Sequence, residues 1–74
     1  MSTATVTSSI EEIGEMAGRV WQSLAKRGPI SLPMLVKEVN APRDLVMQAV
    51  GWLAREEKVW IEEESRRRII SLRE

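Results

Sequence analysis

Arginine side chains are the groups in this 74-residue chain with the clearest capacity to bind a ligand. Arg66, Arg67 and Arg68 are consecutive, and guanidinium groups donate strong charge-assisted hydrogen bonds to phosphate oxygens. The acidic run Glu62–Glu64 lies just before them, so the local charge nearly cancels. The triplet therefore has two interpretations: a cluster that binds a phosphate backbone, or one side of two strands joined by ion pairs.

A second set of candidate binding residues has the spacing of one helical face. Arg43, Gln48 and Arg55 fall on the outer side of a helix expected between residues 42 and 57. Glutamine is suited to an adenine edge, and arginine to a guanine edge or a phosphate. Asp44 lies on the same face and would repel phosphates. A solvated helix face without a ligand is the alternative interpretation.

Three apolar residues form a candidate surface for contact with another protein. The alternation of residues 59–61 turns Trp60 outward, and Ile69 lies diagonal to it on the same side of the hairpin. Met47 lies near Gly51 on the outer face of the helix expected over residues 42–57. Aromatic residues are enriched at protein interfaces. The alternative, equally open, is that the N-terminal segment around Val6 covers Trp60.

The residue types for catalysis and metal binding are scarce. The chain has no Cys and no His, which excludes a disulfide, the usual zinc sites and the common nucleophile–base pairs. Its glutamates form runs rather than a metal-binding pattern, and it has no Gly-rich phosphate loop. We therefore expect no enzymatic activity, no cofactor and no small-molecule substrate.

Charge and hydropathy limit the partners and the location. Eleven basic and eleven acidic residues give a formal net charge of zero, which argues against strong non-specific binding to nucleic acid. No run of about 18 apolar residues is present, so we expect no membrane span. The lack of a signal-peptide pattern and of Cys is compatible with the cytoplasm, which is the expected location.

The first element that must position these residues is a helix from about residue 10 to Arg27. Ser8 and Ser9 are candidate N-caps of this helix. Residues 1–9 are expected to be a disordered lead-in, and residues 10–74 are expected to form the domain. Gly28 and Pro29 end the helix. Its expected inward face is apolar at helical spacing: Ile10, Ile13, Ala17, Val20, Trp21 and Leu24.

Two shorter helices follow a brief extended piece. Residues 29–31 are expected to be extended and able to pair with the last strand of the chain. Ser31 is the candidate N-cap of a helix over residues 32–39, and a turn at residues 40–42 leads into the helix over residues 42–57. The helix period is lost after Leu53 and alternation begins at Val59, which predicts a β-hairpin.

The apolar pattern of the hairpin fixes its register. One arrangement places four apolar side chains on one face and two opposite-charge pairs across the strands. Its pairs are Val59 with Leu72, Ile61 with Ile70, Glu63 with Arg68, and Glu64 with Arg67. The tip would be Ser65-Arg66, but tight turns favour Gly or Asn, so we expect a looser loop from Glu64 to Arg67.

The core is expected to be small. A chain of this length buries only about 60% of the surface of its unfolded form. Aliphatic packing aided by Trp21, Trp52 and Trp60 must supply the stability. Gly14, Gly18 and Gly51 are expected at close internal approaches, with contact across a dimer as the alternative for the first two.

The predicted order is helix, short strand, helix, helix, strand, strand, which is the α+β winged helix-turn-helix architecture with the hairpin as the wing. Residues 10–72 resemble a family of small prokaryotic winged helix-turn-helix proteins that is catalogued as a domain of unknown function. The resemblance is carried by Gly14-Glu15-Met16-Ala17-Gly18, by Gly51-Trp52-Leu53-Ala54-Arg55-Glu56 and by the hairpin. It implies the fold, and binding of nucleic acid only by analogy.

Two functional hypotheses follow. The first is a non-enzymatic module that binds double-stranded DNA through Arg43, Gln48 and Arg55 and through the wing arginines. We expect it to act as a homodimer in transcription regulation. The second is a protein-interaction module, for dimerisation or as an adaptor, that keeps this fold without binding DNA. The element order and the wing arginines make the first the main hypothesis, and the outward Trp60 and the balanced charge motivate the second.

Overall fold

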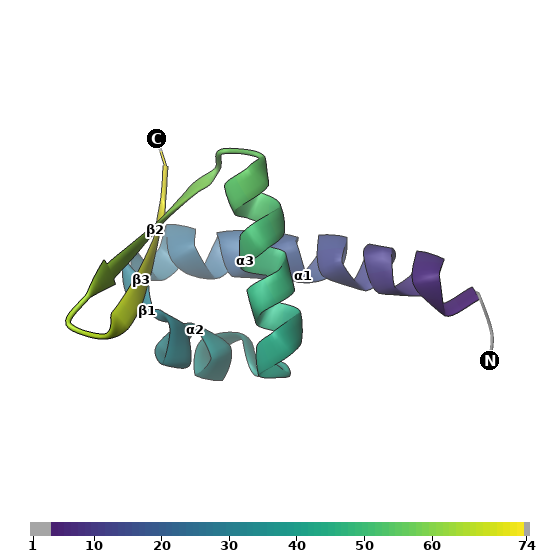
Figure 1. Cartoon of the computed structure of the whole chain (residues 1–74), viewed down its shortest axis with the longest axis horizontal. Helices are drawn as coiled ribbons and strands as arrows, with labels where there is room; N and C mark the ends of the chain where they lie inside the picture. The colour runs from purple at the N-terminus through teal and green to yellow at the C-terminus, as the bar shows by residue number, and fades with distance from the viewer. Residues whose placement is uncertain (1–3, 74) are drawn as a thin grey trace.

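Three helices and a three-stranded antiparallel sheet make up the part of the chain that the structure describes (Figure 1). This computed structural model describes the backbone of residues 4–73 and the side chains of residues 10–73. The elements are α1 (Ala4–Arg27), β1 (Ile30–Ser31), α2 (Leu32–Val39), α3 (Arg43–Arg55), β2 (Val59–Glu64) and β3 (Arg67–Leu72). The element order predicted from the sequence is confirmed.

The sheet has the strand order β1-β3-β2, so the last strand is the central one. Ile70 of β3 is paired with Ile30 on one side and with Ile61 on the other. The predicted hairpin register and the predicted pairing of the short strand with the final strand are both confirmed. Ile61, however, is exposed, because it lies on an edge strand, and α1 and α2 contact the sheet at β3 rather than at β2.

The core is aliphatic, and the expected tryptophan contribution is wrong. Trp21, Trp52 and Trp60 are 44%, 37% and 48% exposed. Trp21 and Trp52 lie at the edges of the buried faces of α1 and α3, so their rings remain partly exposed to solvent. Trp60 is on the outer side of the hairpin. The buried side chains are instead Met16, Ala17, Val20, Leu24, Ile30, Leu32, Leu35, Val39, Val46, Ala49, Val50, Leu53, Val59 and Ile70.

The first helix starts earlier than expected. It begins at Ala4 and runs through Ser8 and Ser9, so neither serine is its N-cap and residues 4–9 are not a disordered lead-in. No Gly or Pro interrupts residues 4–9, and extending an existing helix costs little once its nucleus is packed. Residues 1–3 lie outside the described residues. The predicted end is confirmed: Gly28 has φ 81° and its N–H donates to the carbonyl of Leu24 at 2.8 Å.

The turn between α2 and α3 uses a left-handed residue. Ser31 occupies the N-cap position of α2 with extended backbone angles, but its side chain makes no capping hydrogen bond. Asn40 ends α2 with φ 55°, and its N–H donates to the carbonyl of Val36 at 3.0 Å. Pro42 is the N-cap of α3 rather than its first residue. The turn directs Arg43 to the start of α3.

The third helix ends at Arg55, two residues before the expected boundary. The N–H of Glu57 donates to the carbonyl of Ala54 at 3.0 Å, and that of Lys58 to the carbonyl of Leu53 at 2.9 Å. This pair of bonds is the Schellman motif, which needs a left-handed residue after the cap, and Glu57 has φ 60°. Because this position is not a glycine, no plain stop signal marks the end of α3 in the sequence.

The hairpin tip is tighter than expected. Glu64 and Arg67 are the last paired residues, so Ser65 and Arg66 form a two-residue turn and the predicted looser loop is wrong. Ser65 has φ 46° and Arg66 has φ 73°. Two positive φ angles are the signature of a type I′ turn, whose twist matches that of the strands. The alignment of the strands thus outweighs the poor turn preference of these two residues.

We expect Arg66→Gly to be more stable than Arg66→Ala by about 1 kcal/mol, because only glycine adopts φ 73° without strain. Both variants lose the same guanidinium, so the alanine variant is the matched control. Urea denaturation followed by circular dichroism measures the difference. Equal midpoints for the two variants would contradict the left-handed turn.

Candidate nucleic-acid interface

Four arginines from two distant segments line one pocket of about 290 Å³. Arg43 comes from the first residue of α3 and the others from the tip of the hairpin. The first turn of α2 supplies the apolar part of the lining. The complete lining, here named the arginine pocket, is Leu32, Pro33, Arg43, Glu63, Arg66, Arg67 and Arg68. The structure thus brings together four of the six predicted DNA-binding residues.

The charge of the arginine pocket differs from that of the whole chain. Its lining has four guanidinium groups and one carboxylate, which leaves a local excess of positive charge on a chain of zero net charge. The predicted pair of Glu63 and Arg68 is present, with Nε and Oε2 3.6 Å apart. Glu64 lies opposite Arg67 in the register, but the described residues include no ion pair to Arg67 or Arg66. Neutralisation of the wing is therefore smaller than the sequence suggested.

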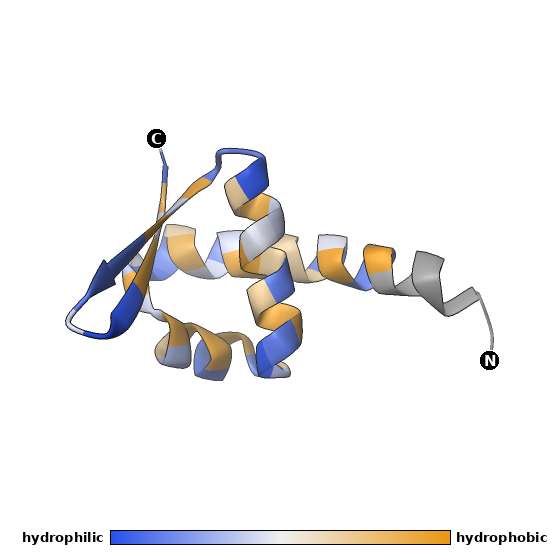
Figure 2. Ribbon diagram, in the orientation of Figure 1, coloured by the Kyte–Doolittle hydropathy of each residue, from blue (hydrophilic) through white to orange (hydrophobic). Residues whose placement is uncertain are grey.

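The remaining two predicted DNA-binding residues lie apart from the arginine pocket. Gln48 and Arg55 are exposed on the outer face of α3, together with Asp44. Arg55 borders a separate hollow beside Trp52. It follows Arg43 by more than three helical turns, about 18 Å along the axis. Contact of Gln48 and Arg55 with bases stays a prediction. Figure 2 shows that hydrophilic residues continue along the outer half of the hairpin.

The candidate protein-contact residues form a smaller surface than expected. Trp60 is exposed, and the guanidinium of Arg73 lies 4.4 Å from its ring centroid. Ile69 and Met47 are half-buried rather than exposed, and Met47 packs against the core. The alternative in which Val6 covers Trp60 concerns a side chain outside the described residues, so it stays a prediction. Arg73 covers one face of the indole from the C-terminal side.

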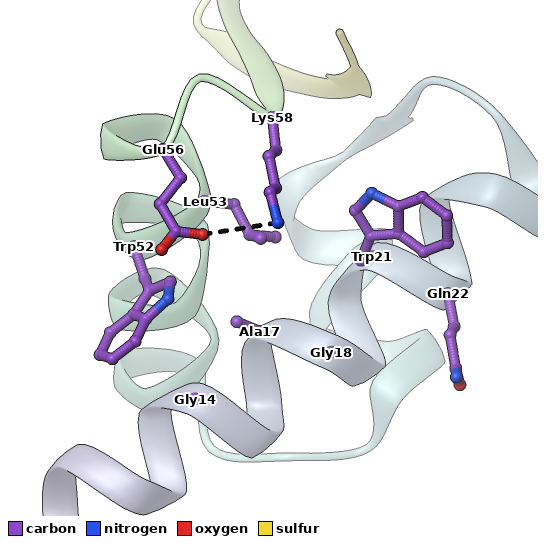
Figure 3. Close-up of a pocket in the computed structure, with 9 residues that line it drawn as sticks. All are labelled: Gly14, Ala17, Gly18, Trp21, Gln22, Trp52, Leu53, Glu56 and Lys58. Carbon is purple, nitrogen blue, oxygen red and sulfur yellow. Dashed lines mark ion pairs between the residues drawn. The ribbon is translucent and has the colours of Figure 1, made fainter. Parts of the chain in front are cut away.

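A second hollow lies between α1 and α3 (Figure 3). It measures about 350 Å³, and Trp21 and Trp52 stand at its two sides. We name it the tryptophan groove; its lining is Gly14, Ala17, Gly18, Trp21, Gln22, Trp52, Leu53, Glu56 and Lys58. The Lys58 ammonium and the Glu56 carboxylate, 3.7 Å apart, span one end of it.

The glycines explain why the groove is open. A Cβ added at Gly14 would meet Cζ2 of Trp52 at 4.0 Å, which is ordinary contact within the fold. At Gly18 and Gly51 no heavy atom of another packed element in the described structure lies within 4 Å of such a Cβ, so the expected internal packing of these two glycines is wrong. The groove was not predicted from the sequence, because Trp21 was assigned to the core. The spacing of Gly14 and Gly18 in the sequence is the feature that could have indicated it.

Among the described residues, no group of three or more acidic side chains is placed to hold a metal ion. None of the described helices combines the length and the hydropathy needed to cross a bilayer.

Comparisons with known proteins agree with this architecture. Residues 7–72 match the family model described as "Winged helix-turn-helix domain (DUF2582)". The chain is 27% identical over 64 residues to "Uncharacterized protein MJ1608" of Methanocaldococcus jannaschii, covering 84% of this chain and 91% of that one. The solution NMR structure of protein BT2368 from Bacteroides thetaiotaomicron is similar with a TM-score of 0.78 and 40% identity, over 84% of this chain and 76% of that chain.

Proposed function

The chain belongs to the DUF2582 family of winged helix-turn-helix domains, and from that premise we propose that it binds double-stranded DNA. The arginine pocket would hold backbone phosphates, and the outer face of α3 would face the major groove. The proposed setting is transcription regulation in the cytoplasm, without catalysis. The fold makes such a role possible, and the residues of the site are what supports it.

The observation that carries the proposal is the convergence of Arg43 with the wing arginines. Arginines at a helix N-terminus and on an adjacent hairpin can contact phosphates on both sides of the groove that the helix enters. Ion pairing within the hairpin does not account for Arg43, which comes from another element and lines the same pocket. The pocket lies at the N-terminal end of α3, the end from which recognition helices reach base edges.

Local rather than overall charge would supply the affinity. Four phosphate contacts predict that the logarithm of the binding constant falls with the logarithm of salt concentration with a slope of about −3.6. This is a modest electrostatic contribution, which agrees with a chain of zero net charge. A homodimer would present two arginine pockets and about double the slope.

The test is fluorescence anisotropy of labelled duplex DNA titrated with the full chain over a series of salt concentrations. We expect binding at low salt, with the predicted slope for one or two sets of four contacts. No binding at low salt would overturn the proposal. A single strand of the same sequence, as competitor, separates recognition of the duplex from general attraction to phosphate.

A second candidate function is contact with another protein through the wing, and the exposure of Trp60 favours it. We expect Trp60→Ser to abolish retention of such a partner without loss of folding, because the side chain is outside the core. Affinity purification with the wild type and the variant measures the retained proteins. Arg73→Ser, which removes the group stacked on the ring but keeps the indole, is the control. Identical sets of retained partners for wild type and Trp60→Ser would contradict this candidate.

A further inference from the structure

We propose that the tryptophan groove is a dimer interface, in which a second copy of this chain docks with the two α1 helices antiparallel. The groove is separate from the arginine pocket, so this inference does not rest on DNA binding. The exposure of the groove, the shape of α1 and the distribution of charge along α1 support it.

The groove exposes large apolar side chains beside polar ones, and no other part of the described monomer covers them. Trp21 and Trp52 together expose two large indole rings across a floor made by Gly14 and Gly18. Ile10, 51% exposed, lies one helical turn before Gly14 and extends the apolar surface along α1. Large apolar side chains grouped in this way mark an interaction site rather than scattered surface residues.

The helix α1 is also longer than the body that it packs on. Figure 1 shows its N-terminal turns projecting beyond α3, and the molecule measures 41 × 23 × 19 Å. Ile10 precedes the groove residues of α1 on the N-terminal side, and the groove itself lies where α1 packs against α3. A projection and a groove on one helix are the two complementary halves that a two-fold axis can join.

An antiparallel register centred on Gly18 matches small residues to large ones. It places Ile10 of one copy opposite Lys26 of the other and beside Ala25, and it places Gly14 opposite Gln22 and beside Trp21. Gly18 then lies opposite Gly18 of the other copy, where the absence of side chains lets two helices approach closely. The open space around Gly18 in the monomer is thus filled by the backbone of the second copy.

The charges of α1 select the antiparallel orientation. Between residues 10 and 27, the residues before Gly18 are acidic and those after it are basic. The acidic group is Glu11, Glu12 and Glu15, and the basic group is Arg19, Lys26 and Arg27. An antiparallel pair therefore places Glu11 near Lys26 of the other copy, whereas a parallel pair would oppose like charges. This complementarity to itself makes a second copy the occupant.

The test is the molar mass of the full chain in solution, measured by sedimentation equilibrium over a range of concentrations. We expect a monomer–dimer equilibrium in the wild type. Gly18→Leu should weaken the dimer at least about tenfold, a difference of about 1.4 kcal/mol, because it fills the contact between the helices. It should not unfold the monomer, since leucine favours a helix more than glycine does. Gly51→Leu is the matched control, an equally open helical glycine on α3, and should leave the dimer unchanged.

A charge exchange tests the orientation. Glu11→Lys and Lys26→Glu should each weaken the dimer, and the double variant should restore it, because the pair is re-formed with reversed signs. A wild type that is monomeric at every concentration would overturn the proposal and leave the groove to another partner. A dimer that Gly18→Leu does not weaken, or a double variant that is no tighter than the single ones, would also overturn it.

Discussion

The double variant Arg66→Glu, Arg67→Glu is expected to bind duplex DNA about 100-fold more weakly than the wild type at low salt. Each guanidinium lost removes a charge-assisted hydrogen bond worth about 1.5–3 kcal/mol, and exposure to solvent places the effect near the lower end of that range. The salt dependence should also become shallower by about 1.8 in slope, since two phosphate contacts disappear. Fluorescence anisotropy over a salt series measures both quantities.

The matched control has the same change in net charge at other places. Arg27→Glu with Arg73→Glu alters α1 and the end of the hairpin remote from its tip, and neither residue lines the arginine pocket. It removes two exposed ion pairs, to Glu38 and Glu57, which contribute little to stability. Equal loss of affinity in the two double variants would show a response to net charge alone and would contradict the proposed site.

Leu24→Ala should destabilise the fold by about 2–5 kcal/mol, whereas Trp21→Ala should cost about 1 kcal/mol or less. Leu24 is 1% exposed and surrounded by the core, so its removal leaves a cavity. Trp21, one turn earlier on the same helix, overhangs the groove and leaves none. Small domains have stabilities of only about 5–15 kcal/mol, so the leucine variant should be partly unfolded at physiological temperature.

The comparison is made by chemical denaturation in the Gly18→Leu background, in which the proposed dimer contact is blocked. Any effect of Trp21 on association is then excluded from the measurement. A greater loss from Trp21→Ala than from Leu24→Ala would place the indole inside the core and contradict the exposed groove.

The features that the sequence could predict are those determined by local patterns. The alternation of Val59, Ile61, Ile70 and Leu72 permits only one register that keeps most apolar side chains together, and the structure has that register. Gly28 followed by Pro29 ends a helix by backbone geometry alone, so the boundary at Arg27 was predictable. The element order, and with it the winged helix-turn-helix fold, followed from these local signals.

The features that could not be predicted from the sequence depend on how the elements pack against one another. Helical periodicity placed Trp21 in the apolar stripe. Smaller side chains form the buried contact between α1 and α3, and the indole lies outside it at the side of the tryptophan groove. The turn at Ser65 and Arg66 is imposed by strand alignment against the residues' own preferences. Arg43 joins the wing arginines only because α2 turns the chain back toward the hairpin tip, which no pattern within α3 indicates.

The central position of β3 has a consequence for synthesis of the chain. Ile70 is among the most buried residues, and it is translated after all three helices and both strands that flank it. A nascent chain can pair α1 with α3, but its sheet must wait for β3, with Ile30 and Val59 still uncovered. Productive folding on the ribosome is therefore delayed until residues 67–72 emerge, and the interval is when chaperones would meet this protein.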